Sequence, residues 1–353
     1  MKNKKPRAIV GMSGGVDSSV SAYLLKKRGF DVVGVFIETW HPEGFYCPEK
    51  EERRDAMRVA SSLDIPLYTV DAKKLYKKYV ADEMIREYKA GRTPNPDILC
   101  NKFVKFETLF QIAKKLDADF VATGHYACIN IEDGKTVLSE PKDKEKDQTY
   151  FLWAVSNEKL EQIIFPLENL TKQEVRAIAK KAGIPVADKK DSQGICFLGP
   201  LDLKKYLKIN ITTKKGKVKN IKGGIIGTHD GVWFYTEGER HGFNITKKGV
   251  NDEPMYVLKK DVKNNTLTVG SQKDLSNEYT FKLTKVSFNE DTRLLNGGLF
   301  DARFRYRQKK QKTELFKKTG NWYVSVKSPT PIAEGQSVVF YKGQKVMGGA
   351  ILS

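Results

Sequence analysis

The stretch Gly11-Met12-Ser13-Gly14-Gly15-Val16-Asp17-Ser18-Ser19 directly follows the short apolar run Ala8-Ile9-Val10. Two adjacent glycines let a backbone turn tightly and present its N–H groups to a ligand. The serine hydroxyls add donors, and a helix that begins here directs the positive end of its dipole to the same place. This order of strand, glycine turn and helix start predicts an anion-binding loop. The alternative is a turn that only reverses the chain, which would not require these serines and an aspartate.

The loop is not a Walker A sequence, because no Lys-Ser/Thr pair closes it. It resembles the SGGxDS loop of the ATP pyrophosphatases, or PP-loop enzymes, which split ATP into AMP and pyrophosphate. The resemblance implies ATP with Mg²⁺ as the ligand, Ile37 packing on the adenine, and Gly124 leaving room for the nucleotide. A core isoleucine and an ordinary turn glycine are the alternatives for these two. The implied ATP-binding residues are Gly11, Met12, Ser13, Gly14, Gly15, Val16, Asp17, Ser18, Ile37 and Gly124.

Strand-like and helix-like stretches alternate in the first half of the chain. The expected strands are 8–10, 31–37, 67–70 and 120–122, and the expected helices are 18–28, 50–63, 72–90 and 105–116. Thr171-Lys172-Gln173-Glu174 is a capping box that predicts a helix ending near Gly183. Alternation of this kind predicts an α/β fold, with a parallel sheet covered on both faces and ligands at the carboxyl ends of its strands.

The character of the chain changes near residue 204. Strands are expected at 231–235, 255–259, 266–269, 301–306, 321–326 and 336–341, with a hairpin that turns at Lys342-Gly343-Gln344. We therefore predict three domains. Residues 1–203 form a PP-loop (adenine nucleotide alpha hydrolase-like) domain, 204–280 a small central α+β domain, and 281–353 a C-terminal β barrel.

The composition favours a polyanionic partner. The formal charge is +19, from 62 Lys and Arg against 43 Asp and Glu, and such an excess suggests nucleic acid held by phosphate contacts. A generally lysine-rich proteome is the alternative. Four cysteines are too few for a disulfide scaffold. The apolar stretch behind the basic N-terminus is broken by Gly14-Gly15 and Asp17, which argues against a secretory signal, and no apolar run approaches membrane length. We expect a cytoplasmic protein with no membrane partner.

Two cysteines lie in loops with unusual neighbours. Cys100 follows two prolines that fix a non-helical path, and Asp97 and Lys102 are close to it in sequence. The cation at Lys102 would lower the thiol pKa. Cys196 lies in Asp191-Ser192-Gln193-Gly194-Ile195-Cys196-Phe197. Either cysteine could equally be a small buried hydrophobe. The remaining pair, Cys47 and Cys128, lacks CxxC spacing, so no structural metal site is expected.

Longer motifs make the resemblance specific. The chain is similar to the tRNA-specific 2-thiouridylases over nearly its whole length. The matching stretches are GMSGGVDSSVSA at 11–22, GRTPNPDILCNKFVKF at 91–106, ATGHYA at 122–127, KDQTYFL at 146–152, DSQGICF at 191–197, GTHDG at 227–231, RYR at 305–307 and GQSVVFY at 335–341.

The resemblance implies a mechanism. ATP adenylates the C2 oxygen of a wobble uridine in tRNA, and a persulfide on Cys196, loaded by a persulfide-carrying donor protein, delivers sulfur. Cys100 is implied as the nucleophile that attacks the persulfide or the adenylated base, with a transient Cys100–Cys196 disulfide reduced afterwards. Asp97 is implied to shuttle a proton. An iron–sulfur cluster on Cys100, Cys196 and a third ligand such as Asp97 is a further option in relatives.

The resemblance also implies the tRNA contacts, and we expect a monomer. The implied tRNA-binding residues are Asn95, Pro96, Asp97, His125, Lys146, Asp147, Gln148, Arg305, Tyr306 and Gln336. A histidine satisfied within the core, polar loop residues and β-face decoration are the alternatives. The chain departs from the family in YTEGERHGF at 235–243, where relatives carry YTIGQRxGL. A glutamate in place of glutamine is unfavourable beside a polyanion, which puts the tRNA contact of the central domain in doubt.

Two other functions remain open from the residues. A PP-loop amide or amidine ligase acting on a small metabolite would explain the anion-binding loop, but would leave Cys100, Cys196, the charge and the barrel without a role. A non-catalytic RNA-binding protein would explain the charge and the barrel, but would leave the nucleotide loop without one.

Overall fold

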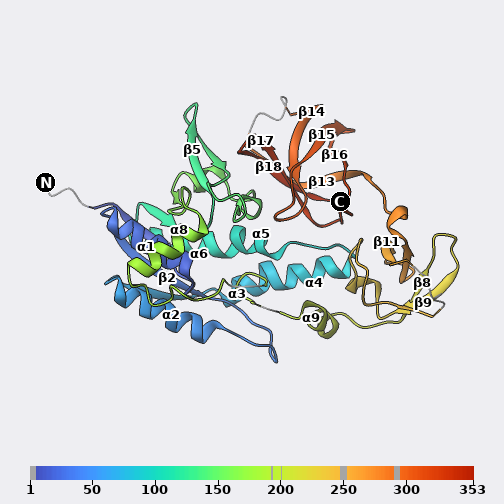
Figure 1. The fold of residues 1–353 in the computed structure, drawn as a ribbon, viewed down its shortest axis with the longest axis horizontal. Coiled ribbons are helices and arrows are strands. Elements are labelled where there is room, and N and C mark those ends of the chain that lie inside the picture. The colour runs from blue at the N-terminus through green and yellow to red at the C-terminus, as the bar shows by residue number, and fades with distance from the viewer. Residues whose placement is uncertain (1–4, 192–193, 200, 247–252, 290–294) are drawn as a thin grey trace. The chain divides into compact units, whose positions relative to one another are not determined.

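The computed structural model describes residues 5–191, 194–199, 201–246, 253–289 and 295–353. It forms two compact units (Figure 1). The first unit comprises Met1–Ala81, Pro96–Leu201 and Lys342–Val346, and the second comprises Asp82–Asn95, Asp202–Tyr341 and Met347–Ser353. Within the described ranges, no helix combines the length and the apolar character that a membrane span requires. The predicted domain boundaries at 203 and 280 stay a prediction.

A five-stranded sheet organises the first unit, with strands in the order β3-β2-β1-β4-β7. All four pairings are parallel. The strands are β1 (Arg7–Gly11), β2 (Asp31–Glu38), β3 (Leu67–Asp71), β4 (Phe120–Ala122) and β7 (Ile163–Ile164). The chain runs outward from β1 to β3 and then returns to the other side of β1, so the strand order reverses between β1 and β4. Ligands of open α/β sheets bind in the crevice at such a reversal.

Both faces of this sheet are buried, which confirms the predicted parallel α/β fold. Successive residues of a strand point to opposite faces, yet Ile9 and Val10 of β1 both have 0% exposure. Val10 belongs to a core cluster that includes Val20 of α1 and Val175 of α8. The helices of this unit include α1 (Val16–Lys27), α2 (Glu49–Ser62), α6 (Phe106–Lys115), α7 (Asn157–Leu160) and α8 (Lys172–Lys181), and η3 (Thr149–Phe151) is a 3₁₀ turn. The predicted capping box is present at Thr171 and Glu174.

The helical region between β3 and β4 is more broken than predicted. Instead of one helix over 72–90, the chain forms α3 (Lys73–Tyr76), the π-helical η1 (Lys77–Ala81) and α4 (Asp82–Lys89). A second π-helical turn, η2 (Asn101–Lys105), joins α5 (Pro96–Cys100) to α6. π-Helical turns widen a helix locally and are frequent at functional sites. After β4, β5 (Cys128–Glu132) and β6 (Lys135–Ser139) form a hairpin.

The second unit contains a small sheet in the order β10-β9-β8-β12-β11. Its strands are β8 (Gly216–Lys219), β9 (Ile225–His229), β10 (Asn244–Ile245), β11 (Tyr256–Asp261) and β12 (Thr266–Gly270), preceded by α9 (Leu203–Asn210). The predicted strand at 231–235 is wrong, because Val232–Phe234 is a 3₁₀ turn, η4. Asn265 accepts a hydrogen bond from the Val232 amide, and Gly231 has φ 146°, so the segment turns inward instead of pairing.

The C-terminal strands form the predicted barrel, in the order β13-β16-β15-β14-β17-β18 with β13 pairing to β18. Its core includes Phe304, Val324, Val338 and Ala350. The strands are β13 (Glu278–Phe288), β14 (Gly298–Arg303), β15 (Gln311–Lys318), β16 (Asn321–Lys327), β17 (Ser337–Lys342) and β18 (Lys345–Leu352), and η5 (Gln272–Asp274) precedes them. The strand predicted at 301–306 ends at Arg303.

Candidate active site

The loop after β1 has an uncapped helix start. Gly15 is the N-cap of α1 and supplies no side-chain cap. The hydroxyls of Ser18 and Ser19 both donate to the Gly15 carbonyl, at 3.1 and 2.7 Å, and the Ser13 amide donates to Ser18 Oγ at 3.2 Å. The N–H groups of the first helical turn have no partner within the helix. The positive end of α1 is therefore directed to the crevice beside β4, as an anion site requires.

Glycine is required at two positions of this crevice. Gly14 has φ +72°, and a Cβ there would lie 2.2 Å from the Glu52 carbonyl oxygen. Gly124, in the loop after β4, packs on the backbone of α1, because a Cβ there would lie 2.7 Å from both Asp17 C and Ser18 N. Gly124 thus lets the β4 loop approach the start of α1. The role expected for it, leaving room for a nucleotide, stays a prediction, as does adenine packing by the buried Ile37.

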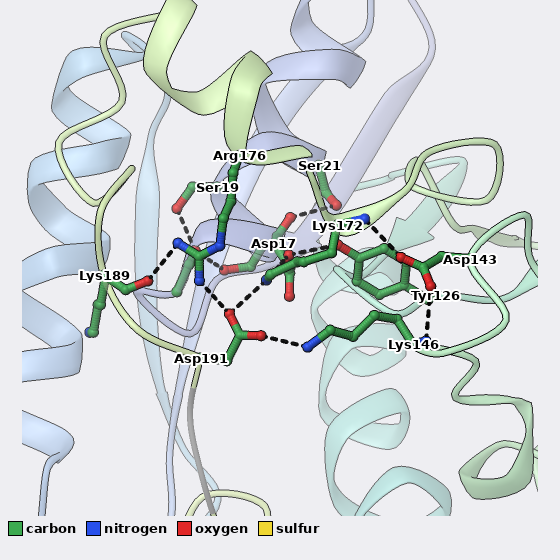
Figure 2. A network of polar contacts seen from close by, with 12 residues as sticks. Asp17, Ser19, Ser21, Tyr126, Asp143, Lys146, Lys172, Arg176, Lys189 and Asp191 are labelled. Atoms are coloured by element: carbon green, nitrogen blue, oxygen red, sulfur yellow. Dashed lines mark hydrogen bonds and ion pairs between the residues drawn. The ribbon is translucent and has the colours of Figure 1, made fainter. Parts of the chain in front are cut away.

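Cations and carboxylates alternate beside the same loop (Figure 2). Asp17 Oδ1 accepts hydrogen bonds from Lys172 Nζ at 2.6 Å and from the Tyr126 hydroxyl at 3.0 Å. Asp191 Oδ1 also pairs with Lys172, at 2.9 Å. Its two oxygens bind Arg176 at 2.7 Å and Lys146 at 2.6 Å.

The cations of this network control the ionisation of Asp191. Partial burial opposes ionisation, but hydrogen bonds from Lys146 and Lys172 hold the pKa of Asp191 well below its ordinary value. A further cation, Lys189, contacts the Gly14 carbonyl at 3.1 Å and Asp55 at 2.7 Å. The loop is therefore surrounded by positive side chains that are already held in place.

The network also bears on a magnesium site. Mg²⁺ is usually bound by one or two carboxylates together with substrate phosphates. Asp17 fits that pattern, because Lys172 and Tyr126 both contact Oδ1 and leave Oδ2 facing no described partner. Among the described residues, no group of three or more His, Cys, Asp or Glu side chains is placed to hold a metal ion.

The two candidate cysteines lie together. Cys100 is the last residue of α5, so the non-helical path expected for this segment is wrong: Pro96 begins the helix instead of preventing it. Cys100 Sγ lies 3.7 Å from Cys196 Sγ as a hydrogen-bond donor. Asp97 Oδ1 accepts from the Cys196 amide at 2.8 Å, and the Tyr76 hydroxyl donates to the Cys196 carbonyl at 2.8 Å. The structure thus brings together all three predicted catalytic residues. Ser192 and Gln193 of the same motif lie outside the described residues.

The two thiols are electrostatically unequal. Cys100 has 0% exposure, and burial followed by the Cys196 contact raises its pKa well above the ordinary value. Cys196 is only partly buried. Its pKa is lowered, first by the hydrogen bond from Cys100; burial opposes this shift, and the charge of Lys105 adds to it. Cys196 is therefore the thiol that ionises first.

The cation beside the sulfurs is Lys105, which sequence reasoning missed. The expectation that Lys102 would serve is wrong: Lys102 is exposed, and its ammonium lies over the Phe103 ring, 5.2 Å from the centroid. Lys105 lies over the ring of Phe197, the residue after Cys196, 5.6 Å from the centroid, and contacts His125 Nε2 at 3.3 Å. No propensity-based signal distinguishes the two lysines, because the choice depends on the π-helical turn.

The residues expected to bind tRNA are engaged within the protein in the first unit. His125 is 7% exposed and contacts Thr123 Oγ1 at 2.8 Å. Asp147 accepts from the Thr149 amide and hydroxyl. Gln148 Oε1 accepts from the Tyr126 amide at 3.0 Å. Lys146 pairs with Asp191, while Pro96 begins α5. Their tRNA contacts stay a prediction.

The other expected tRNA contacts belong to the second unit. Arg305 and Tyr306 follow β14 in a turn instead of decorating a β face, and Arg305 donates to the Pro331 carbonyl at 2.8 Å. The side-chain amide of Gln336 donates to the Thr93 carbonyl at 2.8 Å, and Asn95 lies in the same loop as Thr93. These residues remain predicted contacts.

The divergent segment of the second unit has a local explanation. Glu239 stands where relatives carry glutamine, and its Oε2 accepts from the Thr236 amide at 3.0 Å. Burial raises the pKa of Glu239. The carboxylate is thus used within its own turn.

The two remaining cysteines, Cys47 and Cys128, are not part of the candidate site. Cys47 is exposed, and Cys128 Sγ donates to Glu168 Oε2 at 3.3 Å. Burial, with Glu168 beside it, raises the pKa of Cys128 to about 12.

Comparison with known families and proteins covers the whole chain. Residues 6–200 match the family model of the tRNA methyl transferase HUP domain, 204–271 that of the tRNA methyl transferase PRC-barrel domain, and 278–352 that of the aminomethyltransferase beta-barrel domain. The tRNA-specific 2-thiouridylase MnmA 1 of Geobacillus kaustophilus is 44% identical, over 99% of this chain and 96% of that protein. The tRNA-specific 2-thiouridylase MnmA of Halalkalibacterium halodurans is 42% identical, over 100% and 96%.

Proposed function

Because the chain belongs to the tRNA-specific 2-thiouridylase family, we propose that it installs sulfur at C2 of the wobble uridine of tRNA, using ATP for activation and a persulfide on Cys196 as the sulfur source. The enzyme is a tRNA sulfurtransferase. The observation that carries the proposal is the 3.7 Å approach of Cys100 Sγ and Cys196 Sγ. The same unit of the structure holds the anion-binding loop.

The loop after β4 supports coupling between the two chemistries. Gly124 packs on the start of α1, and the next residue, His125, contacts Lys105 beside Cys196. Activation and sulfur delivery at one uridine need both sets of groups close to the same base. The tripeptide Thr123-Gly124-His125 contacts both sets of groups, the start of α1 through Gly124 and Lys105 through His125.

Activation is the first proposed step. The C2 oxygen of the uridine bonds to the α-phosphorus of ATP, and pyrophosphate leaves. The uncapped N-terminus of α1 and the cations Lys172 and Lys189 would stabilise the charge that develops on the leaving group. Mg²⁺ held by Asp17 would supply further charge neutralisation on the phosphates.

Sulfur transfer is the second proposed step. The donor protein's persulfide gives its terminal sulfur to the Cys196 thiolate and leaves as a thiolate. The terminal sulfur on Cys196 then bonds to C2 and AMP leaves, which gives a C2–S–S–Cys196 adduct. Cys100, as a thiolate, attacks Cys196 Sγ, and the electron pair of the broken S–S bond goes to the sulfur on C2. The products are 2-thiouridine and a Cys100–Cys196 disulfide, which an external thiol reductant returns to two thiols.

The geometry supports the last of these bonds. A disulfide requires an S–S distance of about 2.0 Å, so the two sulfurs need only a small approach from 3.7 Å. Asp97, whose pKa is raised by burial, stands beside Cys196 and can accept the proton that Cys100 gives up. We extend the proposal to tRNA contacts through Asn95, Pro96, Asp97, His125, Lys146, Asp147, Gln148, Arg305, Tyr306 and Gln336.

One experiment tests the whole proposal. Labelled ATP is mixed with unmodified tRNA, with and without a persulfide donor, and AMP, pyrophosphate and thiouridine are measured. We expect AMP only in the presence of tRNA, and one sulfur atom per tRNA once the donor is added. AMP formed with a small acceptor in the absence of tRNA would contradict the proposal and favour an amide or amidine ligase.

A further inference from the structure

The position of Lys105 follows from the π-helical turn. Lys105 is the last residue of η2 and comes five residues after Cys100. In an α-helix, residues five apart point about 140° away from each other. In η2 the Phe106 amide donates to the Asn101 carbonyl, a hydrogen bond five residues long that widens the turn. The wider turn brings Lys105 toward the side of the helix where Cys100 meets Cys196.

The contacts of Lys105 lie around Cys196. Its ammonium lies over the ring of Phe197, the residue that follows Cys196, 5.6 Å from the centroid. It also lies 3.3 Å from His125 Nε2. Burial acts to lower the pKa of Lys105, but Cys196 and then Cys100 outweigh it, so the pKa is raised. Lys105 therefore stays a cation at neutral pH.

His125 contacts the Lys105 ammonium and itself stays neutral. An ammonium group has donors only, so His125 Nε2 must be the acceptor, and Nδ1 carries the proton that is donated to Thr123 Oγ1 at 2.8 Å. Burial and the charge of Lys105 keep the pKa of His125 well below its ordinary value. Phe106 stacks on the imidazole, with ring centroids 5.9 Å apart. The ring is thus neutral, oriented and fixed in place.

We propose that Lys105, held by neutral His125, stabilises negative charge on the sulfur at position 196 and so favours Cys196 over Cys100 as the sulfur carrier. The charge is first that of the thiolate that accepts sulfur and then that of the terminal sulfur of the persulfide. This proposal rests on sulfur transfer through Cys196. Lys105 acts on the reacting sulfur through its charge, and it forms no covalent bond. The other groups that face this site are Cys100 and Asp97 on α5 and the Tyr76 hydroxyl on α3.

The test measures the reactivity of one cysteine without tRNA or ATP. Full-length wild-type protein, Lys105→Met, Lys105→Arg and the exposed control Lys102→Met are treated with iodoacetamide from about pH 5 to 10. Mass spectrometry then measures the modified fraction of the Cys196 peptide. We expect Lys105→Met to move the Cys196 profile to higher pH and to slow alkylation at neutral pH by on the order of tenfold. Lys105→Arg should restore part of the rate, and Lys102→Met should match wild type.

Several outcomes would overturn the proposal. One is a Cys196 profile in Lys105→Met that coincides with wild type, even if thiolation falls. Another is an equal shift in Lys102→Met, which would show that any nearby charge has the effect. If thermal unfolding shows that Lys105→Met is not folded, Lys105→Gln is tested in its place, and the same criteria apply. The proposed function is tested by a separate measurement, and full thiolation by Cys196→Ser would contradict it. The Cys196 alkylation profile does not depend on that result.

Discussion

The backbones of Gly124 and Ser18 are in direct contact: a Cβ atom at Gly124 would lie 2.7 Å from the Ser18 nitrogen. Real Cβ atoms do not approach a backbone this closely, so any side chain at 124 must push the β4 loop away from the start of α1. The contact ties the anion-binding loop to the segment that carries His125.

Gly124→Ala should therefore weaken ATP binding by about tenfold or more and lower the free energy of unfolding by roughly 1–3 kcal/mol. Calorimetric titration with ATP and thermal unfolding measure the two effects. Gly224→Ala is the matched control, because a Cβ there meets only the side chain of Asn220, at 3.3 Å. Unchanged ATP affinity in Gly124→Ala would contradict the assignment of this crevice.

Asp17→Ala should abolish ATP-dependent turnover, because it removes the carboxylate that orients Lys172 and is the expected Mg²⁺ ligand. The loss should exceed about 100-fold in AMP formation. Asp188→Ala is the control, since Asp188 pairs with Lys180 on the exposed surface of the same unit. Retained adenylation in Asp17→Ala would show that the loop is misassigned.

Cys196→Ser should abolish thiolation while tRNA binding stays intact, because the hydroxyl cannot carry sulfane sulfur. Thiouridine yield and tRNA affinity are measured on the same preparation, with Cys47→Ser as the exposed control. A normal thiouridine yield from Cys196→Ser would remove this residue from the mechanism.

Asp191 should contribute stability that depends on pH. Its folded-state pKa is lowered, so the stabilisation is present above the ordinary carboxyl pKa and is lost as pH falls through the folded value. Unfolding at a series of acidic pH values should show that Asp191→Asn costs about 1–2 kcal/mol at neutral pH and progressively less in acid. An equal difference at every pH would mean that the charge of Asp191 has no part in stability.

The binding of tRNA should weaken steeply with salt. With a net charge of +19, we expect several phosphate contacts and a loss of affinity of about 100-fold or more between about 50 and 200 mM salt. Filter binding at a series of salt concentrations gives the slope, and Arg305→Ala should reduce it by about one contact. A tRNA affinity that does not change with salt would show that the net positive charge of the protein has no part in tRNA recognition.

The sequence was sufficient for the fold because local patterns and tertiary structure agree there. The glycine loop after a buried strand, the alternation of elements and the capping box at Thr171 all reappear in the structure. For the candidate site, the resemblance predicted Cys100, Cys196 and Asp97, and the structure places these three residues together. Their catalytic roles stay a prediction.

The misses share a physical cause. Lys102 was favoured over Lys105 because it is closer to Cys100 in sequence, in a segment expected to be non-helical. The segment is instead α5 followed by the π-helical turn η2. The strand expected at 231–235 was displaced by a side-chain cap from Asn265, which is distant in sequence. The cation network around Asp191 combines side chains from α8 and two loops. None of these contacts has a local signature.

Two hydrogen bonds fix the main chain of Cys196: Asp97 accepts from the amide, and the Tyr76 hydroxyl donates to the carbonyl. Neither bond involves the sulfur. These two hydrogen bonds therefore do not depend on the chemical state of the side chain, whether it is a thiol, a persulfide or half of a disulfide. In the proposed mechanism Cys196 takes all three forms in every turnover, and its α-carbon can keep one position throughout.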